Sequence, residues 1–430
     1  MKTDQFLHIE LPLIHTELRN HFNIDNSRID HFTFDYDFID LLELLNHICC
    51  EKIFYFKSKY KDFSFLGLGV SQTINGSDLN QYLTHHPDSY LTTSFSFEEN
   101  PMTAEFTLPE WTFITQNGKT KLHVQKSFEY KNFSAPNLFF NLNFDLNHYD
   151  PFIPPWTSYE ELPEHDQWTS MIDECNSALE CGELLKIVMS RKKIFEYSEP
   201  IEPIAFFKSL IDKNSKNNSY QIFSQTFFGS AFLSITPEQL FSIQDNIFES
   251  ISLAGSAARG KTPEDDQILE DYLKTSDKLI REHKVVTDEI TKLLTPLSQK
   301  LMVYPLEIMK LPYIQHRAAH INALLKEHIK PLELIHLLHP TPAVGGLPWS
   351  IAKNKIAELE PYKRGSYAAP IGVISARYSE LAVGIRSAII EREKLTIFGG
   401  AGIVKGSTPE EEWVETGVKM NPFLQVVNHE

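Results

Sequence analysis

The residues with the clearest chemical potential lie in the last fifth of the 430-residue chain. Glu412 and Glu415 are three residues apart and Lys419 follows four residues later, so all three side chains share one face if the segment is helical. Just before them, the glycine-rich stretch from Gly399 to Gly402 predicts a turn whose bare backbone can approach a ligand closely. Together with Arg386 upstream, these groups suit a small anionic substrate that binds through a metal ion.

This segment matches neither of the common phosphate-binding loops. A Walker loop requires Gly-Lys-Ser, whereas the chain has Lys405, Gly406 and Ser407 in that order. A dinucleotide fingerprint requires a third glycine where Lys405 stands. An acidic helix face is also commonly just a solvated surface. The segment alone therefore leaves both a binding site and a solvated helix open.

Three charged residues elsewhere stand in surroundings that favour a chemical role. Lys186 adjoins a β-branched apolar run, where burial lowers the pKa of a lysine and makes it a general base, although such a lysine can also extend its amine to the surface. Glu238 follows a proline at a strand edge and is either a fixed acid or an ordinary turn carboxylate. Glu282 lies amid apolar neighbours in a predicted helix, where a carboxylate needs a cation.

Composition sets the class of protein. With 42% hydrophobic and 12% aromatic residues the chain can build a large core, and no apolar run approaches the length of a membrane span. The net charge of −17, without a long basic stretch, argues against nucleic acid as the main partner. The N-terminus has charges where a secretory signal would be apolar, and none of the four cysteines has zinc-type spacing. We therefore expect a cytoplasmic protein with reduced thiols and no membrane segment.

The first 150 residues indicate mainly antiparallel sheet. Strands are expected at Ile53–Phe56, Phe63–Gly69 and Asn137–Phe144, and Asn117-Gly118 between two apolar runs is a strong hairpin signal. The proline-rich stretch from Pro151 to Trp156 then marks an organisational break.

Helices and strands alternate after this break. The pattern predicts a helix from Tyr159 to Leu185 that runs into the strand-like KIVMSRKKIFEY. A long helical stretch is expected from about Pro263 to Leu294, because apolar residues recur there near helical spacing.

Nine motifs in this half, taken together, resemble the chorismate-utilising enzymes, which include isochorismate, salicylate, anthranilate and aminodeoxychorismate synthases. The close match covers roughly residues 170–425, and FYFKSKYKDFSFLGLG extends it weakly into the first half. The motifs are GELLKIVMSR, TPEQL, LAGSAARG, SDKLIREH, IQH, HPTPAVGGLP, ELEPYKRGSY, VGIRSA and GGAGIVKGSTPEEEWVETGVK.

Two positions in these motifs bear on the nucleophile. Lys186 stands where the water-using members of the family have a lysine base and the ammonia-using members typically have glutamine. Ala254 stands where aminodeoxychorismate synthases have a nucleophilic lysine. These positions leave the two water-using enzymes, and LAGSAARG, HPTPAVGGLP and ELEPY look more like isochorismate synthases, of the menaquinone or siderophore type, with salicylate synthase as the alternative. The resemblance implies chorismate as substrate, water as nucleophile and no amidotransferase subunit.

The resemblance also implies a role for each site residue. Mg²⁺ would be held by Glu282, Glu415 and Glu412, Lys186 would be the general base, and Glu238 would be the general acid. The remaining residues would bind the substrate: Arg386 and Tyr367 with the backbone amides near Gly400 and Gly402 at a carboxylate, Lys419 beside the metal helix, and Gly255, Ser256 and His316 along the ring pocket.

The fold implied by the family is an α/β (α+β) sandwich, as in anthranilate synthase component I. Two large, mainly antiparallel sheets stack face to face with helices outside. Residues 1–150 would form the N-terminal part and residues 151–430 the chorismate-binding catalytic region of one integrated domain, so that the break at residue 151 is a seam within it. The family also implies a monomer.

Overall fold

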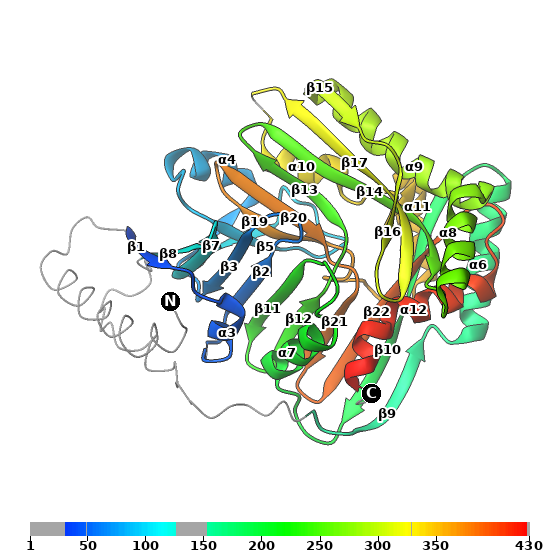
Figure 1. Ribbon diagram of the computed structural model, residues 1–430, viewed down its shortest axis with the longest axis horizontal. Helices are drawn as coiled ribbons and strands as arrows, with labels where there is room; N and C mark the ends of the chain where they lie inside the picture. Colours follow the sequence, from blue (N-terminus) through cyan, green and yellow to red (C-terminus); the bar gives the residue numbers. More distant parts are fainter. Residues whose placement is uncertain (1–30, 49, 126–152, 328, 428–430) are drawn as a thin grey trace, which may run out of the picture.

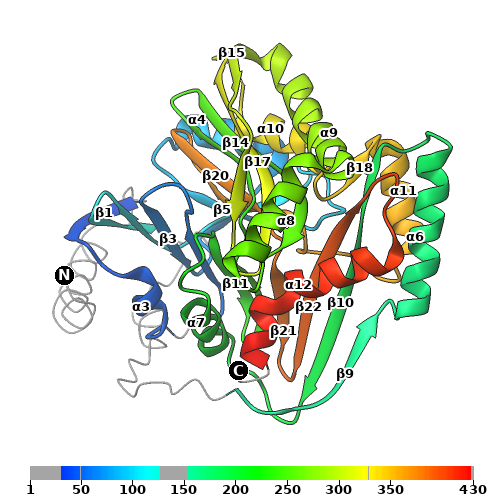
Figure 2. The same cartoon turned by 45° about the vertical axis from the view of Figure 1, so that its right-hand side comes forward.

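The computed structural model describes residues 31–48, 50–125, 153–327 and 329–427. These residues form two large β-sheets, which we call sheet A and sheet B, with helices packed around them (Figures 1 and 2). The strand pairings in both sheets are antiparallel. This architecture confirms the predicted fold class.

Within the described residues, sheet A has twelve strands, and β9 pairs with β10 beside the main path. In spatial order they are β1 (His31–Asp37), β8 (Lys119–Gln125), β7 (Trp111–Gln116), β3 (Phe63–Leu68), β2 (Ile53–Lys57), β11 (Gln221–Phe227), β12 (Ser230–Ser234), β21 (Ser387–Glu391), β22 (Lys394–Ile403), β10 (Lys186–Tyr197) and β18 (Gly346–Leu347), with β9 (Trp156–Leu162) on β10.

Sheet B has ten strands in the same part of the chain, and β16 pairs with β17 beside the main path. In spatial order they are β15 (Ser298–Val303), β17 (Ile314–Leu325), β14 (Ile247–Ala258), β13 (Gln239–Gln244), β20 (Tyr378–Val383), β19 (Pro370–Ile374), β5 (Leu91–Ser94), β6 (Glu105–Leu108) and β4 (Gln72–Asn75), with β16 (Glu307–Lys310) on β17. Strands that precede residue 126 therefore occur in both sheets.

The helices pack on these sheets in three groups. Helices α3, α7 and α12 bury apolar residues against sheet A, α4, α9 and α10 do so against sheet B, and α6 and α11 cover β10 and β22. Their bounds are α3 (Leu41–Leu45), α4 (Gly76–His85), α6 (His165–Glu180), α7 (Pro203–Lys213), α8 (Pro263–Thr275), α9 (Asp277–Leu294), the 3₁₀ turn η2 (Thr295–Leu297), α10 (Pro331–Leu338), α11 (Trp349–Leu359) and α12 (Pro409–Val427).

Strand β2 shows how side-chain alternation builds the layers. Tyr55 belongs to the cluster beneath α3 and α7, whereas its neighbours Phe54 and Phe56 belong to a cluster that includes Ile371 and Tyr378 of sheet B. Successive side chains of a strand point to opposite faces, so one apolar run serves both the outer and the inter-sheet core. The second cluster holds the two sheets together.

The predicted local elements can be compared with the structure where it describes their residues. The Asn117-Gly118 hairpin is confirmed, with φ of 51° and 72° at the two residues and strands β7 and β8 on either side. The helix expected from Tyr159 to Leu185 is wrong at its start, because residues 156–162 form β9 and α6 begins at His165. The expected strand at Asn137–Phe144 lies outside the described residues.

The long helix expected from Pro263 to Leu294 is two helices. Ser276 lies between them with φ −65° and ψ 117°, an extended conformation that ends α8 and begins α9. The apolar periodicity did not show the break, and it overstated the packing of α8, where Leu273 is buried but Ile268 is exposed. The break matters because it sets the direction in which α9 carries Glu282.

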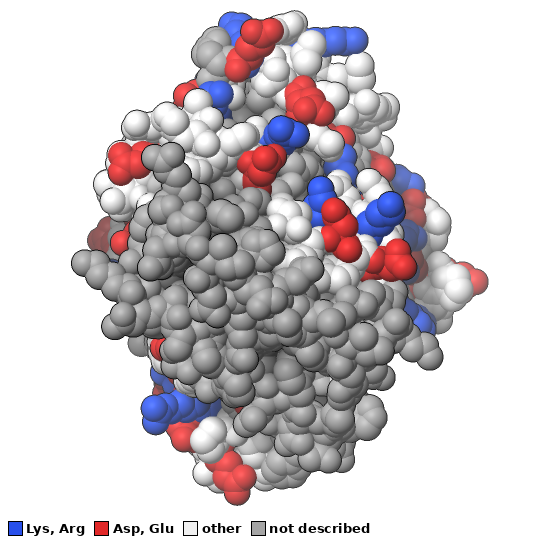
Figure 3. Space-filling view, turned by 90° about the vertical axis from the view of Figure 1, so that its left-hand side faces the viewer, with Lys and Arg blue, Asp and Glu red and all other residues white. Residues whose placement is uncertain are grey.

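Two features of the described part of the chain concern its surface. No helix there is long and apolar enough to cross a membrane. Among the described residues on the face seen in Figure 3, lysine and arginine side chains are interspersed with aspartate and glutamate.

Candidate active site

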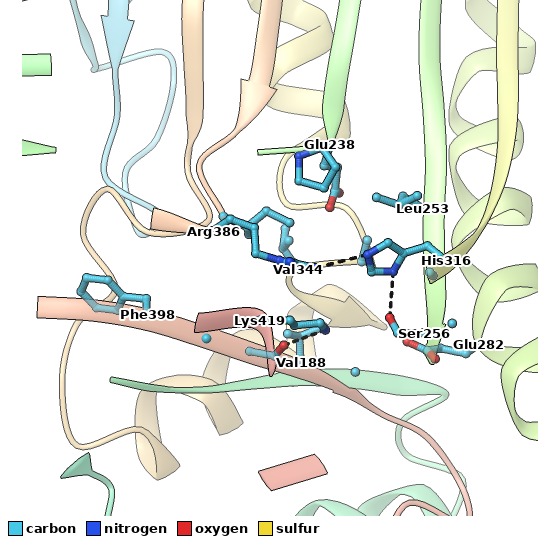
Figure 4. Close-up of a pocket in the computed structure, with 18 of the residues that line it drawn as sticks. Val188, Glu238, Leu253, Ser256, Glu282, His316, Val344, Arg386, Phe398 and Lys419 are labelled. Atoms are coloured by element: carbon cyan, nitrogen blue, oxygen red, sulfur yellow. Dashed lines mark hydrogen bonds between the residues drawn. The ribbon is translucent and has the colours of Figure 1, made fainter. Parts of the chain in front are cut away.

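A cavity of about 50 Å³ lies between the two sheets, and its wall combines β10 and β22 of sheet A with β14 and β17 of sheet B. Figure 4 shows Glu238 and Glu282 at opposite ends of this group of side chains. A cavity of roughly 150 Å³ holds benzene, so lining side chains must move before a larger ring substrate enters. The predicted site residues that line the cavity are Lys186, Glu238, Gly255, Ser256, Glu282, His316, Tyr367, Arg386, Gly400, Gly402 and Lys419.

Lys186 begins β10 and is almost completely buried, with 1% of its surface exposed. Its Nζ lies 3.0 Å from Glu282 Oε1, which comes from α9. Gly402 on the neighbouring strand makes this contact possible, because a Cβ there would lie 2.8 Å from Lys186 Cε and would also clash with Glu282 Oε1. The strand pairing and one glycine therefore place a buried amine against a carboxylate at the cavity wall.

Glu238 stands at the end of the loop that leads into β13 and is 4% exposed. The backbone of the loop is fixed on both sides of this residue: Val383 N donates to Glu238 O at 3.0 Å, and Glu238 N donates to Thr236 Oγ1 at 3.2 Å. Burial raises the pKa of Glu238 to about 7, against the opposing charges of nearby lysine and arginine side chains. A substantial fraction of this carboxyl group is therefore protonated near neutral pH.

Three polar residues form a hydrogen-bonded chain across the cavity (Figure 4). The guanidinium of Arg386 lies 3.2 Å from His316 Nε2, and His316 Nδ1 lies 2.9 Å from Ser256 Oγ. Burial and the charge of Arg386 hold the pKa of His316 well below its usual range, so the imidazole is neutral. Because the guanidinium can only donate, the imidazole proton lies on Nδ1 and is donated to Ser256.

The local backbone explains why these residues meet. Ser256 and His316 are register partners on β14 and β17, and the register shifts at Gly255, which has φ +78°. Such a bulge re-aims the side chains that follow it. Arg386 itself has φ 47°, in the left-handed region, between β20 and β21. Its buried Nε has no hydrogen-bond partner in the described part of the chain, so a donor remains for an anionic ligand.

The glycine stretch is a strand and not the expected turn. Gly399 to Gly402 lie within β22 and pair with β10, and none has a positive φ. The glycines instead make room for side chains: a Cβ at Gly400 would lie 2.5 Å from Tyr367 Oη. Lys419 Nζ also reaches this strand and donates to Gly400 O at 2.9 Å. We expected these glycines to let a ligand approach the backbone closely. In the structure, side chains of neighbouring elements, such as Tyr367 and Lys419, approach it.

The three predicted metal-binding carboxylates are each paired with a lysine. The pairs are Glu282 with Lys186 at 3.0 Å, Glu412 with Lys278 at 2.8 Å, and Glu415 with Lys419 at 2.6 Å. In the described residues, no three His, Cys, Asp or Glu side chains are gathered closely enough to hold a metal ion.

The chemistry of this donor set nevertheless fits a hard divalent cation. The donors are carboxylate oxygens, which Mg²⁺ prefers, and each already neutralises a cationic group. Glu412 is 3% exposed, and burial together with the charge of Glu415 raises its pKa to about 7, against Lys278. Glu412 and Glu415 do not line the cavity in the described arrangement.

The sequence did not predict a buried ion pair that lies behind the cavity. Arg364 and Glu360 are joined at 2.6 Å and 2.9 Å, and Arg364 also donates to the backbone oxygens of Val344 and Val188 at 2.7 Å and 2.6 Å. Both valines line the cavity. The motif ELEPYKRGSY contained both charged residues, but their i, i+4 spacing alone resembles a surface pair.

Comparisons with known proteins identify the relatives of this chain. The family described as chorismate binding enzyme matches residues 80–428. The isochorismate synthase MenF of Haemophilus influenzae is 29% identical over 387 residues, which cover 88% of this chain and 87% of that protein. The isochorismate synthase DhbC of Bacillus subtilis is 32% identical over 273 residues, covering 62% of this chain and 69% of that protein.

Solved structures show the same relationship. MenF, the menaquinone-specific isochorismate synthase from Escherichia coli, superposes with a TM-score of 0.83 at 25% identity, covering 97% of this chain and 99% of that one. Anthranilate synthase component I from Streptococcus pneumoniae shares the fold, with a TM-score of 0.60 at 20% identity over 93% of each chain. Sequence and fold thus agree, and the chain belongs to the chorismate binding enzyme family.

Proposed function

We propose that this chain is an isochorismate synthase, which converts chorismate reversibly into isochorismate. The attacking water adds at C2 and gives up a proton, the double bonds shift, and the C4 hydroxyl leaves with a proton as water. Substrate and product have the same composition, so no redox cofactor is needed. The isochorismate synthases among the relatives support this reaction.

One observation carries the proposal. A buried lysine and a buried carboxyl group whose pKa is about 7 line the same cavity. Two groups that begin a reaction in opposite protonation states require separate environments. Lys186 lies against Glu282 at one end, whereas Glu238 lies at the other (Figure 4). A protein that only bound chorismate would not require both groups.

Lys186 is the proposed general base. Its amine lies 3.0 Å from Glu282 Oε1 in the described structure, so the side chain must leave this contact to reach a water molecule in the cavity. Movement of the Lys186 side chain also enlarges the cavity beyond its described volume.

Glu238 is the proposed general acid. Its pKa of about 7 supplies a protonated carboxyl group at neutral pH without a partner that would trap the proton. Fixed backbone hydrogen bonds on both sides keep the side chain at one place on the cavity wall.

Arg386 and Tyr367 are proposed to bind a substrate carboxylate. The unpartnered Nε of Arg386 provides the charged donor, and Tyr367 is held by stacking on Phe398, with ring centroids 5.0 Å apart. His316, neutral and oriented by Arg386, and Ser256 then present a polar wall to the ring. Gly255, Gly400 and Gly402 leave the space that these side chains occupy.

Glu282, Glu412 and Glu415 are proposed to hold Mg²⁺. When bound, this cation would neutralise their carboxylates and that of the substrate, and it would compete with Lys186 for Glu282.

The test is incubation of the purified chain with chorismate and Mg²⁺, followed by separation of the products. Isochorismate alone is the expected product. Salicylate with pyruvate would identify a salicylate synthase, and anthranilate formed with ammonia would show that Lys186 does not select water. We expect turnover without an amidotransferase subunit.

A further inference from the structure

The sequence FYFKSKYKDFSFLGLG, from the first half of the chain, forms the hairpin of β2 and β3, and its turn reaches from sheet A to sheet B. Ser58 Oγ donates to Glu380 Oε1 on β20 at 2.8 Å and accepts from the backbone N of Lys61 at 3.0 Å. Lys61 Nζ pairs with Glu249 on β14 at 2.5 Å. The turn is therefore fixed to sheet B on both sides of Lys59.

Lys59 points from this turn toward the loop that carries the proposed acid. Its Nζ donates to the backbone oxygen of Pro237 at 3.0 Å and lies 3.2 Å from Met309 Sδ on β16. Pro237 lines the cavity and directly precedes Glu238. The lysine thus holds one end of the peptide bond that joins Pro237 to Glu238.

Other hydrogen bonds fix the same loop at different points. Tyr220 N donates to Thr236 O at 2.8 Å, and Ile235 N donates to Arg386 O at 3.1 Å. Neither bond involves the peptide between Pro237 and Glu238, whose nitrogen donates to Thr236 Oγ1 at 3.2 Å and whose oxygen accepts from Lys59. Removing the lysine would leave the Pro237 oxygen without that partner in a largely dry site, which favours rotation of this peptide and displacement of the carboxyl group.

We propose that Lys59 is a positioning residue for the general acid, acting through the Pro237 carbonyl. The inference rests on the proposed function, because it assigns Glu238 its role. Lys59 acts through geometry: the charges that oppose the raised pKa of Glu238 are those of Lys186, Lys419 and Arg386, and not that of Lys59. It gives the hairpin in the first half of the chain a direct part in the chemistry.

The test compares Lys59→Met with Lys59→Arg and with Lys61→Met as a matched control in the same turn. For Lys59→Met we expect kcat to fall at least tenfold with KM changed less than twofold, because a misplaced acid affects turnover more than substrate binding. Lys59→Arg keeps a donor and should recover most of kcat. Lys61→Met should keep wild-type kinetics, since it removes only the partly exposed ion pair with Glu249, while Ser58 still fixes the turn through Glu380 and the backbone N of residue 61.

A second measurement separates this inference from the proposed reaction. Crystal structures of the wild type and Lys59→Met should differ at residues 235–238, whatever reaction the enzyme catalyses. An unmoved loop, wild-type kcat in Lys59→Met, or an equal loss in Lys61→Met would overturn the positioning role. If Lys59→Met fails to fold, Lys59→Leu, which also lacks a donor, takes its place in both measurements, and full kcat with an unmoved loop in that variant counts equally against the role. A wild type that makes no isochorismate would refute the proposed function instead.

Discussion

Replacing Glu238 with glutamine should remove activity and stabilise the fold at the same time. Burial raises the pKa of this carboxyl group from 4.5 to about 7. The folded state therefore binds the proton more tightly than the unfolded state, and wild-type stability falls as the pH rises from about 4.5 to about 7. That change corresponds to about 3 kcal/mol of unfolding free energy, because solvent does not screen a group that is this deeply buried.

Glutamine resembles the protonated carboxyl group but cannot give up a proton in the reaction. Glu238→Gln should therefore lose roughly 10²- to 10⁴-fold in kcat, the usual contribution of a general acid. Its free energy of unfolding should exceed that of the wild type by about 3 kcal/mol at pH 8 and equal it near pH 4. Wild-type kcat should decline above pH 7 as the acid loses its proton.

The assay pairs steady-state kinetics with urea unfolding of both proteins between pH 4 and pH 8. Magnesium binding, followed by calorimetry, serves as the control and should be unchanged because Glu238 is not a proposed ligand. A variant with normal turnover would refute the acid role. A variant less stable than the wild type at pH 8 would show that the carboxylate has a compensating partner, contrary to the described environment.

Other substitutions test the rest of the site. Lys186→Ala should lower kcat at least 10³-fold while calorimetry still detects magnesium-dependent chorismate binding, and normal turnover would contradict the base assignment. Glu282→Ala should weaken magnesium binding at least tenfold in the same calorimetric assay, and an unchanged affinity would contradict its role as a ligand. Gly402→Ala should force Lys186 and Glu282 apart and lower kcat at least tenfold with the fold retained by circular dichroism, whereas wild-type kcat would show that the glycine is dispensable.

The sequence was most informative where chemistry and position coincide in a motif. Lys186, Glu238 and Glu282 belong to separate motifs, and the structure brings all three to one cavity. The fold class followed from the family resemblance that the same motifs carry, and the apolar run of β2 was recognised as a strand. Both kinds of signal depend on residues that are close together in the sequence.

Expectations failed where partners distant in the chain decide the outcome. Gly399 to Gly402 predicted a turn because glycine favours turns, but Lys186 and Tyr367 occupy the space that a larger side chain in β22 would fill. The pairing of Glu412 with Lys278 spans 134 residues, and no local pattern indicates it.

The role of Lys59 was equally hidden, since its partner is a backbone oxygen in the loop between β12 and β13, far away in the sequence. Side-chain type and spacing cannot show which carbonyl a lysine reaches. The same limit applies to Arg364, which supports two valines of the cavity wall through their backbone oxygens.

The central claim is that Lys186 activates water for attack at C2 of chorismate. Its most direct test is turnover of chorismate in water enriched in ¹⁸O, with the position of the label determined by mass spectrometry and NMR at early conversion. The account predicts isochorismate with one ¹⁸O in the C2 hydroxyl and no such product from Lys186→Ala. Unlabelled isochorismate, which would require transfer of the substrate's own hydroxyl, would contradict it.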